Sequence, residues 1–370
     1  MLDNGLNNQQ EQFAEPPALQ SRKKDKKTVK ACIALAVAAL LLVASLIAAL
    51  FQFGGQEQAE SAGAEGSEQS AYFAESSETS AESEEVSEEI YEESLELFPQ
   101  IEAVLPENCQ AAGIYEFGSL YCIFAENATE KRSLASITKL ITASVALKYL
   151  SPEYEITAGS ELDLVKPDSS VCGLQKGYKL TLEQLLYGLL MSSGNDAAYT
   201  VAVNVAREVS ESELNDKEAV EYFCVLMNEL AEEIGAVNSS FANPEGWDDE
   251  NNYSTIADIA LIARYAKEIE LIAEISKTDH YTAVISSGEE MVFSNSNFML
   301  HPESQFYNSA VTGLKTGSTS GAGKCLAATL EIDGFEYIAV VMGCPDEQSR
   351  YGAMKTLIEY VEEYHELKFS

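Results

Sequence analysis

Three short polar motifs, separated by long apolar stretches, constrain the fold of this chain more than any other feature. They are S-x-x-K at 136–139, S-G-N at 193–195 and K-T-G at 315–317, in that order. Each motif alone is a weak signal, and S-x-x-K in particular needs only two common residues. A second S-x-x-K occurs at 21–24 in a basic tail, where it has no meaning. The interpretation therefore depends on what surrounds each motif.

The first motif stands at the start of a predicted helix. Apolar residues near one helix face follow the serine: Ile137, Leu140, Ile141, Val145 and Leu147. Because residues three apart are neighbours on a helix, we expect Lys139 beside Ser136. At the helix start the backbone N–H of Ser136 has no helical partner, and the helix dipole favours negative charge. An oxyanion formed in acyl transfer needs a donor at such a position.

The second motif separates two predicted helices. Thr181 and Gln184 are spaced as a capping box, and the nearly all-apolar run 185–191 is typical of a buried helix. That run stops at the S-G-N motif, and a new helical pattern covers 196–207. Polar residues at a break between two buried helices are expected to project into a cleft. Taken by itself, the break also fits an ordinary helix–turn–helix with a glycine.

The third motif lies where the pattern changes to strands. Residues 325–332 and 335–341 are predicted to form a hairpin around an Asp-Gly turn. Gly313 and Gly317 bracket the motif, and glycine in a strand often marks close approach of a ligand or another backbone. A lone K-T-G equally fits a glycine-rich turn with a solvated lysine.

Together, the motifs resemble the active site of the serine-type D-alanyl-D-alanine carboxypeptidases, the low-molecular-weight penicillin-binding proteins of peptidase family S11. The resemblance covers about residues 100–370 without a large gap. It extends to 185–190, 193–198, 226–228, 241–246, 253–255 with Asp258, 295–297 and 313–317. One departure is 247–252, Trp-Asp-Asp-Glu-Asn-Asn, where relatives usually carry a Leu and a His. This departure affects the expected loop structure, not the catalytic set.

The resemblance implies an α/β (α+β) fold of the β-lactamase/transpeptidase-like type for residues 99–370. An antiparallel sheet would be flanked by helices, with a mostly helical subdomain. The segment types agree: a hairpin at 110–125, the Ser136 helix, a helical region to 268, strands over 280–343 and a final helix at 349–367. Many relatives carry a C-terminal β domain and amphipathic anchor, and both are expected to be absent here.

The resemblance also implies that Ser136 attacks a peptide carbonyl and forms an acyl-enzyme. The serine hydroxyl needs a base, and Lys139 is the neighbouring candidate. A free lysine has a pKa of about 10.4, so only roughly 1 in 2,500 is neutral at pH 7. Burial and a second cation would lower that pKa. The resemblance places Lys315 in the same cleft as this second cation.

The remaining roles come from the resemblance alone. Ser193 would relay a proton towards the leaving amine. The N–H groups of Ser136 and Ser318 would form the oxyanion hole. Lys315 and Thr316 would hold the terminal carboxylate of the substrate, and Asn195 its backbone amide. The implied substrate-binding residues are Asn195, Lys315, Thr316, Gly317 and Ser318.

The implied reaction is removal of the terminal D-alanine from peptidoglycan stem pentapeptides, with β-lactam antibiotics as covalent inhibitors. One alternative is a serine β-lactamase of the same fold, which needs a carboxylate to activate the deacylating water, often in E-x-x-L-N. Residues 211–215 match that pattern, but they begin 18 residues after Ser193 in an acidic, exposed-looking segment, so we interpret the match as chance. The other alternative is a catalytically inactive peptidoglycan-binding module, against which the intact motif set argues.

The histidines do not favour other hydrolytic chemistry. The chain has three, His280, His301 and His365, and none lies in a motif or in a zinc-ligand pattern. A Ser-His-Asp triad and a zinc peptidase are therefore disfavoured. We expect neither a metal nor a cofactor.

The N-terminal hundred residues predict where the chemistry takes place. Residues 31–51 are apolar apart from Ser45 and long enough to span a bilayer, so 31–53 is predicted to be a membrane anchor. The tail 1–30 is basic, whereas no Lys or Arg follows the anchor until Lys131, which predicts a cytoplasmic N-terminus and an extracytoplasmic catalytic domain. A cleaved signal peptide is the alternative.

The linker at 54–98 holds fourteen acidic residues between Glu57 and Glu96 and no basic ones. Such a composition predicts a disordered tether between membrane and catalytic domain. The formal net charge of −37 for the whole chain argues against nucleic acid as a partner. Of seven cysteines, six follow the predicted anchor. Cys325 and Cys344 flank the predicted Asp-Gly turn and could be cross-strand neighbours, although unpaired core cysteines fit equally well.

Overall fold

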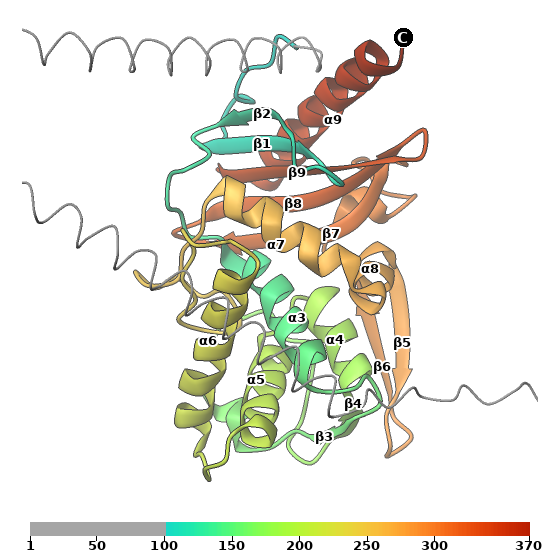
Figure 1. Ribbon diagram of the computed structural model, residues 1–370. Coiled ribbons are helices and arrows are strands. Elements are labelled where there is room, and N and C mark those ends of the chain that lie inside the picture. Colours follow the sequence, from blue (N-terminus) through green and yellow to red (C-terminus); the bar gives the residue numbers. More distant parts are fainter. Residues whose placement is uncertain (1–100) are drawn as a thin grey trace, which may run out of the picture. The chain divides into compact units, whose positions relative to one another are not determined.

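The computed structural model describes residues 101–370, and their framework is a five-stranded sheet (Figure 1). Every neighbouring pair of strands is antiparallel, in the order β2-β1-β9-β8-β7. The strands are β1 (Ala111–Glu116), β2 (Cys122–Glu126), β7 (Val311–Thr319), β8 (Gly323–Ile332) and β9 (Phe335–Cys344). The antiparallel sheet was predicted; that the first strand pairs with the last strand of the sheet was not.

The central strands β8 and β9 form the predicted hairpin. Asp333 and Gly334 join them with φ of 49° and 81°, the positive values that a two-residue hairpin turn uses. Along β8, Cys325 and Ala327 face one hydrophobic core, and Leu326 faces the other. Because both faces of these strands are buried, their sequence is almost continuously apolar instead of alternating.

Helices cover both faces of the sheet (Figure 1). The C-terminal helix α9 (Glu347–Phe369) packs on β8 and β9 from one side. On the other side lie α7 (Ile256–Glu268), against β1, β8 and β9, and α8 (Glu270–Lys277), against β7. The smaller core lies between the sheet and α9. The larger core continues from the opposite face of the sheet into the helical region.

The helical region surrounds α3 (Lys139–Tyr149), which is buried over most of its length and packs against α4, α5, α6 and α7. Its other helices are α4 (Leu182–Leu190), α5 (Asn195–Val209) and α6 (Asp216–Glu233). The short elements are η1 (Ala135–Thr138), η2 (Ser160–Leu164), η3 (Phe298–Leu300) and the two-stranded sheets β3 (Glu155–Thr157) with β4 (Lys179–Thr181) and β5 (His280–Val284) with β6 (Glu290–Ser294). A helical subdomain beside an antiparallel sheet confirms the predicted fold class.

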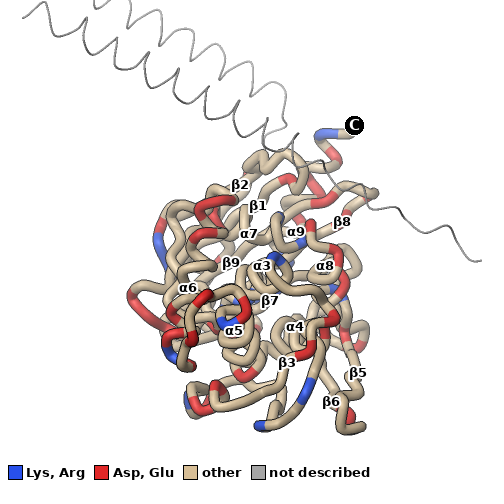
Figure 2. The backbone as a smooth tube through the Cα atoms, turned by 60° about the horizontal axis from the view of Figure 1, so that its bottom comes forward, with Lys and Arg blue, Asp and Glu red and all other residues tan. Residues whose placement is uncertain are grey.

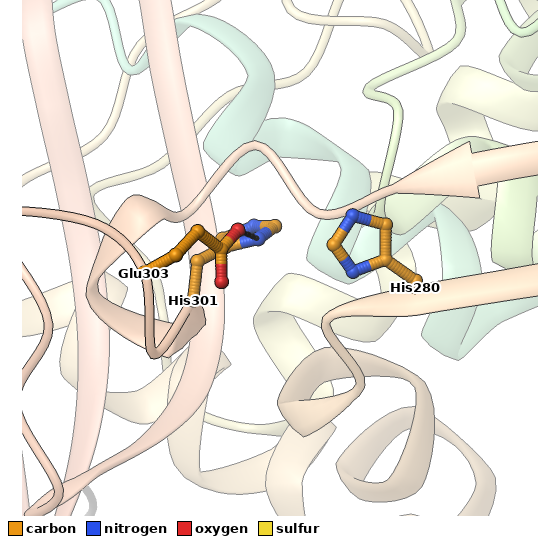
Figure 3. A group of neighbouring side chains, drawn as sticks. All are labelled: His280, His301 and Glu303. Atoms are coloured by element: carbon orange, nitrogen blue, oxygen red, sulfur yellow. Dashed lines mark ion pairs between the residues drawn. The ribbon is translucent and has the colours of Figure 1, made fainter.

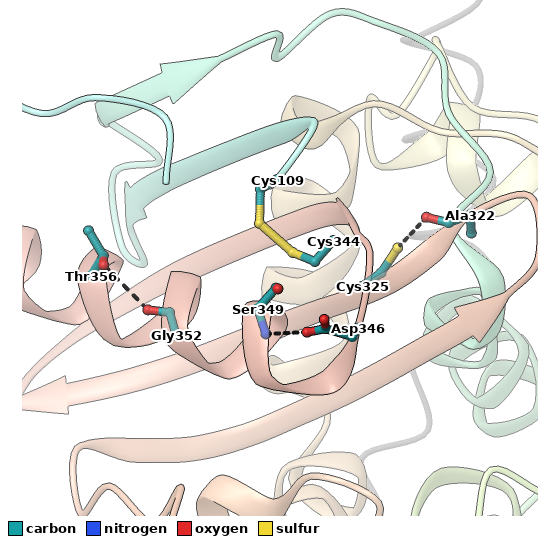
Figure 4. The surroundings of a disulfide bond; sticks show 8 residues. All are labelled: Cys109, Ala322, Cys325, Cys344, Asp346, Ser349, Gly352 and Thr356. Atoms are coloured by element: carbon teal, nitrogen blue, oxygen red, sulfur yellow. Dashed lines mark hydrogen bonds between the residues drawn. A yellow bond between two sulfur atoms is a disulfide. The ribbon is translucent and has the colours of Figure 1, made fainter. Parts of the chain in front are cut away.

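One disulfide ties the two ends of the fold together. Cys109, just before β1, is bonded to Cys344 at the end of β9, 235 residues later in sequence (Figure 4). Cys325 and Cys344 are also not cross-strand neighbours, because the strand register places Lys324 opposite Cys344. Cys325 is instead a buried thiol whose Sγ lies 3.5 Å from the Ala322 carbonyl.

The predicted tail 1–30, anchor 31–53 and linker 54–98 lie outside the described residues, as does the predicted domain boundary at residue 99. Among residues 101–370, no helix combines the length and the apolar character needed to cross a bilayer.

Candidate active site

The S-x-x-K motif lies at a sharp entry into α3. Ser136 is in the 3-10 helix η1, and Lys139 is the first residue of α3. In a 3-10 helix, side chains three residues apart eclipse one another. The Nζ atom of Lys139 accordingly lies 2.9 Å from Oγ of Ser136. The predicted proximity of Ser136 and Lys139 is confirmed, through a tighter turn than the expected α-helix.

Two glycines allow the backbone to hold Ser136 in place. Ala135 has a φ of 50°, an unfavourable value for a residue with a side chain. A Cβ on Gly246, itself at φ 87°, would lie 1.9 Å from the Ala135 carbonyl oxygen. A Cβ on Gly317 would lie 2.8 Å from the Leu134 carbonyl oxygen. The close backbone approach predicted for the K-T-G strand is therefore with the turn that carries the nucleophile.

Lys139 is fully buried in a ring of acceptors. Besides Ser136, its Nζ lies 2.8 Å from Oδ1 of Asn195 and 2.7 Å from the Glu245 carbonyl oxygen. Burial lowers the pKa of Lys139 to about 7, although the carboxylates of Glu245 and Asp196 oppose the shift. Near neutral pH a large fraction of the amine is thus unprotonated, which a general base requires. Burial is the main cause, as predicted, but Lys315, the predicted second cation, does not lower this pKa; the charges that act on Lys139 are the two carboxylates, which raise it.

The S-G-N motif occupies the break between α4 and α5. The predicted capping box of Thr181 and Gln184 starts α4. Ser193 is buried, with a φ of 56°, and Asn195 is the first residue of α5. This geometry brings Asn195 to Lys139 as well as to the cleft, a contact that the sequence analysis did not predict.

Asp196 fastens a loop over this break. Its carboxylate accepts hydrogen bonds from the backbone N–H groups of Cys172, Gly173 and Leu174, each at 2.9 Å. The loop before these residues contributes Asp168, and its neighbours at 169 and 170, to the wall of the cleft. Asp196 therefore positions one rim of the site without entering it.

The K-T-G motif lies on β7, which forms the opposite wall. Nζ of Lys315 lies 3.1 Å from the Thr316 carbonyl oxygen and 3.4 Å from Oγ of Ser296, and Oγ1 of Thr316 lies 2.7 Å from the same Ser296 oxygen. Burial holds the pKa of Lys315 well below its usual value, and the charges of Lys139 and Arg350 lower it further. The two motif lysines thus share one electrostatic environment. Arg350, from α9, was not predicted.

A cleft opens between the two walls, lined by Ser136, Asn195, Glu245 and Ser318. Acidic residues are spread throughout the fold, whereas basic positions are few and some lie at its centre near α3 and β7 (Figure 2). The positive charge expected for a carboxylate-binding site is therefore local.

The comparisons with known proteins agree with this geometry. The model of peptidase family S11, D-alanyl-D-alanine carboxypeptidase, matches residues 108–346. The chain belongs to this family. A D-alanyl-D-alanine carboxypeptidase of Streptomyces sp. (strain K15) is 30% identical over 269 residues, which cover 70% of this chain and 89% of that protein. The crystal structure of the Streptomyces K15 DD-transpeptidase has a TM-score of 0.64 and 28% identity, covering 70% of this chain and 100% of that one.

Other relatives are matched over a smaller share of their own length. The D-alanyl-D-alanine carboxypeptidase DacF of Bacillus subtilis (strain 168) is 27% identical over 260 residues, which are 69% of this chain but 62% of that relative. The chain thus spans less than two thirds of the length of this relative.

Within this family fold, Asp248 is a further residue of the cleft that the sequence analysis recorded only as a loop departure. Its carboxylate accepts hydrogen bonds from Oγ1 of Thr319 at 2.6 Å, Oγ of Ser133 at 2.9 Å and the Gly321 N–H at 2.8 Å. Burial alone would raise the pKa of Asp248, but these hydrogen bonds outweigh it and hold the pKa below its usual value. Asp248 therefore joins the end of β7 to the turn before Ser136.

Glu245 is the second residue that was missed. Its side chain is buried, and Oε1 lies 2.8 Å from the Tyr199 hydroxyl, while no described residue forms a hydrogen bond with Oε2. Burial raises the pKa of Glu245, and the hydrogen bond from Tyr199 and the charge of Lys139 oppose the rise. The Pro-Glu-Gly sequence at 244–246 did not indicate that the Glu245 carboxylate would act on the pKa of Lys139.

The residues weighed for other chemistry lie elsewhere. Glu211 is exposed between α5 and α6, and Asn215 of the same segment caps α6, so the E-x-x-L-N match is structural. His365 is buried on α9, with Nδ1 2.7 Å from the Tyr337 hydroxyl. His280 and His301 lie close to each other, which their sequence separation did not indicate.

Proposed function

We propose that this chain is a serine D-Ala-D-Ala carboxypeptidase that removes the terminal D-alanine from peptidoglycan stem pentapeptides. The observation that carries the proposal is the pair of Ser136 and Lys139, whose reacting atoms are 2.9 Å apart, with the lysine pKa lowered to about 7. A nucleophile within hydrogen-bond reach of a base of matched pKa is the arrangement that acyl transfer needs. Family membership supports the same reaction.

In the proposed mechanism, neutral Lys139 accepts the proton of Ser136 as Oγ attacks the carbonyl of the penultimate D-alanine. The N–H groups of Ser136 and Ser318 stabilise the resulting oxyanion. The C–N bond then breaks as Ser193 passes a proton to the departing amine of the terminal D-alanine, and Ser193 is reprotonated by the ammonium of Lys139. Water next attacks the ester and gives a proton to neutral Lys139, the C–Oγ bond breaks, and Lys139 returns the proton to Ser136.

The other predicted site residues would orient the substrate before reaction. Lys315 and Thr316 would hold the free carboxylate of the terminal D-alanine, and Asn195 the backbone amide of the peptide. Gly317 lets the β7 strand lie against the nucleophile turn, because a side chain there would meet the Leu134 carbonyl. A β-lactam antibiotic would occupy the same place and acylate Ser136.

We propose further that 31–53 anchors the protein in the cell membrane, with 1–30 cytoplasmic and the catalytic domain outside. The asymmetry of basic residues around 31–53 supports this orientation. The Cys109–Cys344 disulfide supports an extracytoplasmic domain, because such bonds persist in oxidising compartments. Membrane fractionation with and without protease tests it. A full-length protein that resists protease added to spheroplasts would contradict the orientation. An N-terminus processed after the apolar run would mean that the run is a cleaved signal peptide.

The decisive experiment treats the full-length protein, in mild detergent, with a muramyl pentapeptide and separately with penicillin. Free D-alanine and protein mass are followed for the wild type, Ser136→Ala and Glu211→Ala. We expect D-alanine release and a stable penicilloyl adduct, both lost only in Ser136→Ala. Rapid penicillin turnover without D-alanine would indicate a β-lactamase, and no reaction with either would indicate a binding module. Adding an acceptor amine measures any transpeptidation.

A further inference from the structure

Two of the three histidines meet outside the catalytic cleft. His280 begins β5, His301 follows η3, and Glu303 lies two residues further on (Figure 3). One potential ligand atom from each of the three side chains lies within 4.8 Å of the others. They line a separate hollow that shares no residue with the catalytic cleft. Segments 21 residues apart in sequence thus bring two imidazoles and a carboxylate together.

His301 is held as a metal-binding histidine is usually held. Its side chain is buried, and Nε2 lies 2.6 Å from the Asn295 carbonyl oxygen. A carbonyl only accepts, so Nε2 carries a ring proton, and in the neutral ring the lone pair is then on Nδ1. That Nδ1 lies 3.5 Å from Oε1 of Glu303. A backbone carbonyl that fixes the tautomer from behind is the common support of a metal-ligating imidazole.

The other two side chains are free to complete a coordination shell. Zinc–nitrogen bonds of about 2.0–2.1 Å in a tetrahedron place ligand atoms about 3.4 Å apart, closer than the 4.8 Å limit here. His280 and Glu303 are 53% and 71% exposed, so both can close the difference by changing rotamer. The present contacts of His280, with Asp279 and Ser294, are both 3.5 Å long and cost little to give up.

We propose that His280, His301 and Glu303 form a zinc-binding site, with water at the fourth position. Two imidazoles and one carboxylate are a ligand set that zinc takes, whereas calcium and magnesium prefer oxygen ligands alone. The bound ion would clip the β5–β6 hairpin to the segment after η3.

The site would also brace one support of the catalytic cleft. Asn295, whose carbonyl holds His301, precedes Ser296, and the Ser296 hydroxyl lies 2.7 Å from that of Thr316. Zinc would therefore stabilise the segment on which the K-T-G strand rests. The proposal does not depend on the proposed reaction, because zinc binding is measured directly.

The test uses the full-length protein, freed of metal with a chelator that is then removed. Zinc is titrated in competition with a chromophoric chelator, and thermal unfolding is recorded with and without zinc. We expect one zinc per chain and a higher Tm with zinc. His280→Asn and Glu303→Gln should each weaken zinc binding more than about tenfold. Loss of a residue that only supports a metal ligand already weakens binding about tenfold, and loss of a ligand should cost more. Both remove exposed side chains, so folding is retained.

Glu290→Gln is the matched control, because Glu290 is also exposed, on β6, but lies outside the cluster. It should bind zinc as the wild type does. Zinc uptake by the acidic residues of 54–98 would persist in His280→Asn and so is separated from this site. Binding that survives both cluster substitutions unchanged, or no binding by the wild type, would overturn the proposal.

Discussion

The two walls of the catalytic cleft each bury a lysine, but they surround it differently. On the helical wall, Lys139 contacts oxygen acceptors, and the carboxylates of Glu245 and Asp196 partly oppose the effect of burial on its pKa. On the sheet wall, the charges that act on Lys315 are the cations Lys139 and Arg350, which add to the effect of burial. One lysine is compensated and the other is not.

This difference teaches how one residue type can serve two functions in one cleft. A buried amine with partial compensation exchanges its proton near neutral pH, as a base must. A buried amine beside other cations is favoured in its charged form only when negative charge comes close to it. The carboxylate of an incoming substrate would supply that negative charge and oppose the lowering of the Lys315 pKa. The comparison thus supports the two roles proposed above, a proton carrier at Lys139 and an anion receptor at Lys315.

The largest effect is expected on the helical wall. Lys139→Met removes the base but keeps an apolar stem of similar length, so acylation of Ser136 should slow by about 10²–10⁴-fold. Single-turnover labelling with a fluorescent penicillin measures this rate. Lys355→Met, on the exposed side of α9, is the control and should acylate normally. Acylation of Lys139→Met at the wild-type rate would remove this lysine from the mechanism.

On the sheet wall, Lys315→Met should act through the substrate carboxylate. Loss of one partner of a buried charge pair predicts a fall on the order of 100-fold in kcat/KM for a peptide with a free C-terminus. A peptide with a C-terminal amide should lose far less, so the preference for the free acid should disappear. Lys324→Met, on the neighbouring strand and outside the cleft, is the control. An equal loss for acid and amide would show that Lys315 is not the carboxylate receptor.

Local signals in the sequence predicted much of both walls. The capping box of Thr181 and Gln184 and the Asp-Gly turn of the β8–β9 hairpin were recognisable because each depends on neighbouring residues. The spacing of Ser136 and Lys139 carried over even though the turn is 3-10, because residues three apart meet in either helix.

Contacts between distant segments were beyond such signals. Asp248 joins residues 71 and 115 positions away, and Cys109 bonds a partner 235 positions away. Because the residues in each of these contacts lie on different segments, no helix or strand periodicity connects them. The same holds for His280 and His301, whose rings meet although one begins β5 and the other follows η3. Glu245 could not be placed because its charge matters only where α5 and α3 converge.

Gly246 lies against the turn before Ser136, and Gly246→Ala should lower the stability of the fold. The new Cβ would meet the Ala135 carbonyl at 1.9 Å, and the residue would keep a φ of 87° that alanine disfavours. We expect a loss of about 2–4 kcal/mol in the free energy of unfolding. Gly352→Ala, in α9, is the control, because a Cβ at Gly352 would meet no neighbouring atom within 4 Å. Alanine at that helical position should stabilise the fold by about 0.5–1 kcal/mol. Chemical denaturation measures both, and equal effects would contradict the steric argument.

The smallest effect should come from Glu245→Gln, which tests the compensation itself. If acylation needs neutral Lys139, its rate rises with pH through about 7 in the wild type. The Glu245 carboxylate favours the protonated lysine and so raises its pKa. Glutamine keeps the shape without the charge, so the lysine pKa falls and the acid limb moves to lower pH. Stopped-flow acylation from acidic to alkaline pH measures the shift, with exposed Glu211→Gln as the unshifted control. An unmoved limb would mean that Glu245 is neutral at the working pH and that burial alone sets the base, and a limb that moves to higher pH would contradict the compensation outright.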